Sequence, residues 1–275
     1  MLRQFTPDFP GYWLITHPDH ARLAGQFAEA WGNDLFLTPE PRFDVLEAIH
    51  HHDDGWLLRD SCPEITRQGK PSAFSSELVG KYSAFEEIDL DAYLAVRQRA
   101  LEEISTRNPY AAIIISKHTY NLLSARADRS TIADKDQPLL DAFLDNQYRQ
   151  QKELRDSLIL DGSYPSEVIT WEKLEQHFRL LQACDNLSLL SCVDYYGTAS
   201  LLHPLPTKNG NEEVAVRGLG QRRFTLDPWP FASSTLSFSI IARRVPGETF
   251  STHEELRDAF HLALPTQLTI ELSPA

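Results

Sequence analysis

Several features that mark particular classes of protein are scarce or missing in this chain. Only 3 of its 275 residues are cysteine and no two form a CxxC pair, so neither a disulfide framework nor a cysteine zinc motif is expected. No stretch approaches the roughly 18 consecutive apolar residues that span a bilayer. Residues 1–20 contain no unbroken apolar stretch after their arginine, which makes them a poor signal peptide. We therefore expect a cytoplasmic protein with reduced thiols and no membrane segment.

An excess of positive charge is also missing. The chain carries 26 Lys and Arg against 39 Asp and Glu, which gives a formal net charge of −13. Sequence-independent binding to nucleic acid or to anionic membranes needs clustered basic residues, so neither partner is expected. The composition is otherwise that of a globular protein, with 42% hydrophobic and 24% charged residues. The expected partner is a small-molecule substrate, and the sequence does not reveal the oligomeric state.

Helical periodicity dominates the chain up to residue 198. Apolar residues recur at helical spacing in six segments, which are 18–32, 43–54, 88–105, 109–125, 136–158 and 170–196. A long irregular stretch from Trp56 to Ala84 interrupts them, and we expect it to reshape or cover any pocket between the helices.

The pattern changes after Gly197. Short segments with alternating and β-branched residues predict strands at 213–219, 222–227, 234–245 and 267–272, and a helix over 251–264 with a capping box of Thr252 and Glu255 interrupts them. We predict a mainly α protein with a helical metal-binding domain over residues 1–198. A small β-rich (α+β) subdomain over residues 199–275 is expected to pack on that helical body.

Four of the predicted helices turn a potential metal ligand into their apolar face. Asp185 falls in the middle of the apolar stripe of its helix, where an unpaired carboxylate would cost several kcal/mol. His20, His52 and His118 face apolar neighbours in the same way, and Asp53 follows His52 directly. Each of these residues alone is more often a hydrogen-bonded core residue than a ligand. Five inward-facing groups on four helices favour a metal centre instead.

The order His20, His52-Asp53, His118, Asp185 resembles the HD superfamily of metal-dependent phosphohydrolases. In that resemblance His20 is the early-helix ligand, His52-Asp53 is the paired motif, His118 is an intervening histidine and Asp185 is the last ligand. It implies an HD-type helical core that holds one or two metal ions. The segments HPDHARLAGQFAEAWG, HHDDGW, ISKHTYNLL, CDNLSLL and LDPWPF also resemble an uncharacterised bacterial family with an HD-like core, which brings no known activity.

Three imidazoles and two carboxylates suit Mn, Fe, Co, Ni or Zn better than Mg or Ca. A hydrolase would use such a metal as Lewis acid and source of hydroxide, and the resemblance implies a phosphate ester of a small molecule or nucleotide as substrate. We expect Asp53 and Asp54 to be the catalytic residues, Asp53 as a ligand and Asp54 as a base.

Two other functions stay open. A di-iron oxygenase of the HD type needs a second metal, and the single well-placed intervening histidine, His118, counts against it. His177 lies at the flank of the last apolar stripe, where a surface position is favoured over a ligand role. A non-catalytic metal-binding or structural protein is the third hypothesis, and the complete ligand set weakens it.

Overall fold

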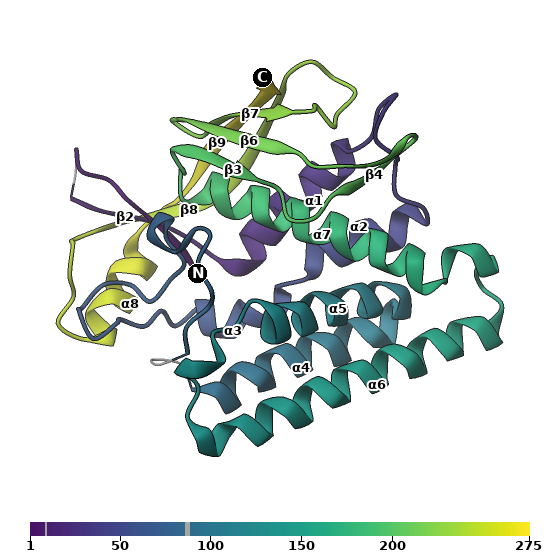
Figure 1. Cartoon of the computed structure of the whole chain (residues 1–275). Helices are drawn as coiled ribbons and strands as arrows, with labels where there is room; N and C mark the ends of the chain where they lie inside the picture. The colour runs from purple at the N-terminus through teal and green to yellow at the C-terminus, as the bar shows by residue number, and fades with distance from the viewer. Residues whose placement is uncertain (9, 86–88) are drawn as a thin grey trace.

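The computed structural model describes residues 1–8, 10–85 and 89–275. A seven-stranded sheet lies at one end of the molecule, and the long helices are stacked away from it (Figure 1). The main helices are α1 (His17–Ala30), α2 (Arg42–His51), α4 (Leu90–Arg107), α5 (Pro109–Ala125), α6 (Gln137–Asp161) and α7 (Trp171–Cys192). α1 and α7 lie nearest the sheet, while α4 and α6 are farthest from it. This arrangement buries α1, α2, α5 and α7 against one another.

The six helical predictions before residue 198 are confirmed, and several of these helices begin at a capping side chain. The side chains of Thr16, Asn108 and Thr170 accept hydrogen bonds from the first turns of α1, α5 and α7, respectively. Gly162 ends α6 in the left-handed conformation, with φ 68°. Ile88, the first residue of one predicted helix, lies outside the described residues.

Short helical turns fill the irregular stretch that follows α2. They are η1 (Asp54–Trp56), α3 (Leu57–Asp60) and η2 (Ser76–Leu78), and three more single turns, η3 (Arg129–Thr131), η4 (Asp134–Asp136) and η5 (Ser166–Val168), join later helices. α8 (His253–Leu262) begins where predicted, with the Thr252 side chain accepting a hydrogen bond from the Glu255 amide.

The sheet has the strand order β1-β2-β8-β9-β7-β6-β3. Its strands are β1 (Leu2–Phe5), β2 (Gly11–Ile15), β3 (Gly197–Ser200), β6 (Ala215–Gly220), β7 (Arg223–Asp227), β8 (Leu236–Pro246) and β9 (Pro265–Pro274). β7 and β9 are parallel, and every other neighbouring pair is antiparallel. β4 (Leu205–Thr207) and β5 (Gly210–Glu212) form a separate two-stranded sheet.

The prediction of a mainly α fold is wrong, because the protein is α+β with half of its residues helical and a seven-stranded mixed sheet. The four predicted C-terminal strands are present as β6 to β9. The prediction missed β1 and β2, which extend the sheet through the pairing of β2 with β8, and it also missed β3, β4 and β5. The sheet therefore draws strands from both sides of the boundary predicted at residue 198, and the division into two domains stays a prediction.

The sheet supports the helices that matter for the site. Phe27 of α1 packs edge-on against Phe238 of β8, with ring centroids 4.8 Å apart, and Gln26 donates a hydrogen bond to the Ser239 carbonyl. α7 contacts β1 and β4. Cys62, Cys184 and Cys192 are free thiols. Within the described ranges, no helix combines the length and the apolar character needed to cross a bilayer.

The N-terminal strands make a testable contribution to stability. Leu14 of β2 is fully buried in a cluster with Tyr12, Val245, Phe250 and Leu256. Replacing it by alanine removes apolar contacts and leaves a cavity, so we expect Leu14→Ala to lower the free energy of unfolding by about 2–5 kcal/mol. Urea denaturation followed by circular dichroism measures this change.

The matched control for that measurement is Leu219→Ala, since Leu219 is on β6 and 39% exposed. Its effect on the free energy of unfolding should be less than about 1 kcal/mol. An equal, small effect of both substitutions would show that β2 is not an integral strand of the sheet.

Candidate metal centre

Four helices, α1, α2, α5 and α7, bring the proposed ligands together. His20 lies in the first turns of α1, His52 caps the C-terminal end of α2, and Asp185 is in the second half of α7. Asp53 follows His52 at the start of η1, and His118 is on α5. All five side chains are buried, with exposures between 1% and 6%. The structure thus places every predicted metal ligand in one region, as the apolar stripes indicated.

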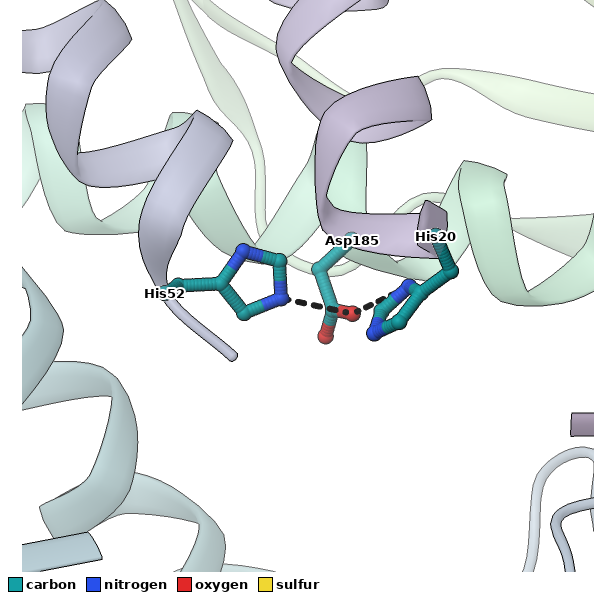
Figure 2. Close-up of side chains that lie close together, drawn as sticks. All are labelled: His20, His52 and Asp185. Carbon is teal, nitrogen blue, oxygen red and sulfur yellow. Dashed lines mark ion pairs between the residues drawn. The ribbon is translucent and has the colours of Figure 1, made fainter. Parts of the chain in front are cut away.

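His20, His52 and Asp185 are close enough to share one ion. One potential ligand atom from each lies within 4.8 Å of the other two. The carboxylate of Asp185 sits between the two imidazoles, 3.5 Å from His52 Nε2 and 3.8 Å from His20 Nδ1 (Figure 2). Asp53 adds a second carboxylate, with Oδ2 at 3.0 Å from His20 Nε2 and 3.9 Å from His52 Nε2.

The hydrogen bonds of His20 indicate which ring nitrogen carries the proton and which one presents a lone pair. The Ser188 hydroxyl donates to the Asp185 carbonyl, at 2.8 Å, and therefore accepts from His20 Nδ1, also at 2.8 Å. In a neutral imidazole the proton is then on Nδ1, and Nε2 presents a lone pair. That lone pair faces the Asp53 carboxylate at 3.0 Å. Two acceptors in contact need a cation or a proton between them.

His52 is held in the same way. Its Nδ1 donates to the Ile49 carbonyl at 2.8 Å, which leaves Nε2 as the atom that faces Asp53 and Asp185. This Nε2 is buried and has no hydrogen-bond partner among the described residues. A backbone carbonyl that orients a histidine through one nitrogen while the other nitrogen binds metal is a recurrent arrangement in metal sites.

The electrostatics of the cluster show that it requires positive charge. Burial opposes ionisation of Asp53, but Arg97 and His52 outweigh it and hold the pKa of Asp53 well below its usual range. Burial also opposes ionisation of Asp185, and its contacts with His52 outweigh this and lower its pKa. Burial alone would lower the pKa of His52, yet Asp53 and Asp185 raise it to about 9. Together with Arg97, a proton on His52 or a metal ion in its place therefore balances the two buried carboxylates.

His118 lies beside His52 rather than between the carboxylates. The two rings are 5.3 Å apart and nearly perpendicular, and the Gln182 amide lies 3.5 Å from His118 Nδ1. Burial lowers the pKa of His118 to about 3, so its ring is neutral at pH 7. A neutral imidazole at this distance can join the ligand set or accept a second ion.

Two predicted positions differ from the sequence-based expectation. Asp54 points away from the cluster, since it accepts hydrogen bonds from Arg22 and His51, and it does not line the adjoining cavity. This arrangement gives no support for Asp54 as a base. His177 is buried rather than exposed, and its Nδ1 is 2.9 Å from the Tyr110 hydroxyl.

Arg97 is the principal residue that sequence reasoning missed. It lies on α4 in the same apolar stripe as Leu90, Leu94, Leu101 and Ile104, so the test that found Asp185 would also have found it. Its Nη1 donates to Asp53 Oδ1 at 2.6 Å. The close approach of α4 depends on Gly55, because a Cβ at Gly55 would lie 2.8 Å from a carbonyl oxygen of α4. The HDDG sequence thus supplies both the ligand and the space for the helix that holds it.

A cavity of about 390 Å³ adjoins the cluster. His20, Asp53, His118 and Asp185 form part of its wall, so these four of the five candidate ligands adjoin a space that can hold a small molecule. Most of the remaining wall comes from the segment between Trp56 and Phe85, which was expected to reshape or cover the pocket. The volume is in the range of small-molecule binding sites.

The role of His52 predicts how the metal-free protein responds to pH. A histidine whose pKa is raised on folding contributes stability below its unfolded pKa of about 6.5. This contribution disappears as the pH rises through about 9, the pKa of His52 in the fold. After chelation, we expect the free energy of unfolding to fall by a few kcal/mol between pH 6.5 and pH 9.5, measured by urea titration at several pH values.

In the His52→Gln variant the free energy of unfolding should no longer fall over this pH range, because glutamine does not titrate. His51→Gln is the matched control on the same helix, and it should retain the decline. An unchanged decline in His52→Gln would show that the charge on His52 does not balance the two carboxylates.

The comparisons with known proteins identify a family without assigning an activity. The chain matches the model of a protein family of unknown function, DUF3891, over residues 1–247. No curated protein and no solved structure matches it. All five candidate ligands lie within the matched residues. Because the match covers far more than half of the sequence, the chain belongs to the DUF3891 family.

Proposed function

We propose that this protein is a metal-dependent hydrolase that acts on a phosphate ester of a small molecule or a nucleotide. The observation that supports it is the pair of imidazole nitrogens, His20 Nε2 and His52 Nε2, that face two buried carboxylates beside a cavity. This donor set fits a divalent transition metal such as Mn, Fe, Co, Ni or Zn, because imidazole is a borderline-soft ligand. His20, His52, Asp53 and Asp185 would hold the ion, with His118 next to them.

Such an ion supplies Lewis acidity and lowers the pKa of a coordinated water towards neutrality. Other residues of the chain fix the orientation of the candidate ligands. Arg97 fixes one oxygen of Asp53 and leaves the other oxygen directed at His20. Ser188 and the Ile49 carbonyl fix the ring orientation of His20 and His52.

The order of the ligands supports phosphate esters as substrates. The sequence His20, His52-Asp53, His118, Asp185 resembles the HD superfamily of phosphohydrolases, and the structure brings these residues together from α1, α2, α5 and α7. The reaction type rests on this resemblance, since one fold can support many activities.

Metal content and turnover, measured together, test the proposal. We expect one or two equivalents of metal per chain by elemental analysis, and turnover of an aryl phosphate with Mn, Co or Ni. The double variant His52→Ala, Asp53→Ala should lose the metal and at least about 100-fold of the turnover. His51→Gln, adjacent on the same helix, should keep both.

The other outcomes each point to a different function. Two irons per chain with uptake of O₂ would contradict the hydrolase and favour a di-iron oxygenase. Bound metal with no turnover, together with a large fall in melting temperature on chelation, would favour a structural role. A wild-type chain that holds no metal after incubation with these ions would contradict the metal centre itself.

A further inference from the structure

A second cavity, of about 300 Å³, is separate from the candidate metal centre. The end of α1, the segment that joins α1 to α2, the first half of α7 and β4 bound it. The described residues of its wall are all different from those of the cavity beside the metal ligands. Its volume is at the lower end of the range for small-molecule sites, and the proposed hydrolysis does not use it.

A buried chain of hydrogen bonds fixes the tautomer of His177, which lies in the wall of this second cavity. The Tyr110 hydroxyl has one proton and donates it to the Val168 carbonyl, at 2.8 Å. Its oxygen therefore accepts a hydrogen bond from His177 Nδ1, 2.9 Å away. The proton of the neutral imidazole is then on Nδ1, and Nε2 presents a lone pair. Burial, with a smaller effect of Lys173, lowers the pKa of His177 to about 4, so the ring is neutral at pH 7.

The lone pair of His177 Nε2 has no partner within the part of the chain that the structure describes. The side chain is only 4% exposed, and Nδ1 is the ring nitrogen that hydrogen-bonds to protein. Nε2 is not among the unpaired polar atoms that the protein encloses completely, so it keeps contact with the cavity that the ring lines. An oriented acceptor on a cavity wall is the kind of polar group that fixes a bound molecule through an N–H or O–H.

The rest of the wall favours an uncharged ligand with an apolar body. Its charged side chains are Lys173 and Glu40, whose formal charges cancel. An anion would bring its negative charge against the lone pair of His177, and it would have no proton to donate. Apart from Thr38 and Gln176, the remaining described residues of the wall are apolar, and they are Trp31, Leu37, Pro39, Leu180 and Pro206.

We infer that this second cavity binds a small neutral molecule, which donates an N–H or O–H to His177 Nε2 and packs its apolar body against Trp31 and Leu180. Phenols and N–H heteroaromatic compounds have this chemistry. The inference goes beyond the proposed function, because the site needs no metal and shares no described wall residue with the candidate metal centre.

Two ligands that differ in one donor test the role of Nε2. 4-Methylphenol and 4-methylanisole share the ring and its methyl group, and only the phenol has an O–H to donate. NMR titration that follows the indole N–H signal of Trp31 gives both dissociation constants at this site, since Trp56 reports on the other cavity. We expect 4-methylphenol to bind about three- to tenfold more tightly, which is the effect of one neutral hydrogen bond.

The decisive variant is His177→Phe, which removes Nε2 and keeps a ring of similar size. We expect it to bind 4-methylphenol no more tightly than 4-methylanisole, while the affinity for 4-methylanisole changes by less than about twofold. His261→Phe is the matched control, because His261 lies on α8 and lines neither cavity. It should keep the full preference for the phenol.

Three results of these titrations would overturn the inference. They are equal affinities for the two ligands in the wild type, a Trp31 signal that moves with neither ligand, and a preference for the phenol that persists in His177→Phe. The tautomer provides a test that needs no variant. A long-range ¹H–¹⁵N correlation spectrum of the wild type should show the His177 proton on Nδ1, and a proton on Nε2 would also overturn the inference. The metal centre is tested separately, by metal content and turnover.

Discussion

The candidate site depends on the charge compensation of two carboxylates that are buried among imidazoles. Asp53 and Asp185 are each almost completely removed from water, and both have a depressed pKa. Charges in such surroundings persist only when opposite charge and hydrogen bonds compensate for the lost hydration. Arg97 donates a hydrogen bond to one oxygen of Asp53. The other carboxylate oxygens still need positive charge near His20 and His52. The protein therefore has a place for a cation even before any function is considered.

The architecture around the cluster serves to hold these groups at fixed positions. The sheet supports α1 through Phe238, and α1 in turn carries His20. Gly55 allows α4 to approach η1 closely enough for Arg97 to reach Asp53. Arg97 thereby joins the cluster to the cavity, since the same side chain contacts a ligand on one side and the aromatic wall on the other.

Much of the site was predictable from sequence because its residues interrupt apolar stripes. A histidine or carboxylate at a core position of a helix has a local signal, and this signal located His20, His52, His118 and Asp185 correctly in one region. Arg97 had the same signal, but a search for metal ligands passes over arginine. The sheet was harder to predict, because β2 is five residues long and its partner β8 is more than 200 residues away in sequence. Short apolar runs do not show by themselves whether they are strands, and the pairing that decides it is not local.

The wide separation of the ligands in sequence has a consequence for biosynthesis. The hydrogen bond that orients His20 joins it to Ser188, 168 residues later in the chain. A ribosome releases the N-terminal ligands long before α7, which carries Asp185, leaves the exit tunnel. If the proposed centre binds an ion, that ion would therefore enter a nearly finished protein rather than nucleate its folding. Loading of the proposed centre would then be a post-translational step that depends on the ions around the completed polypeptide.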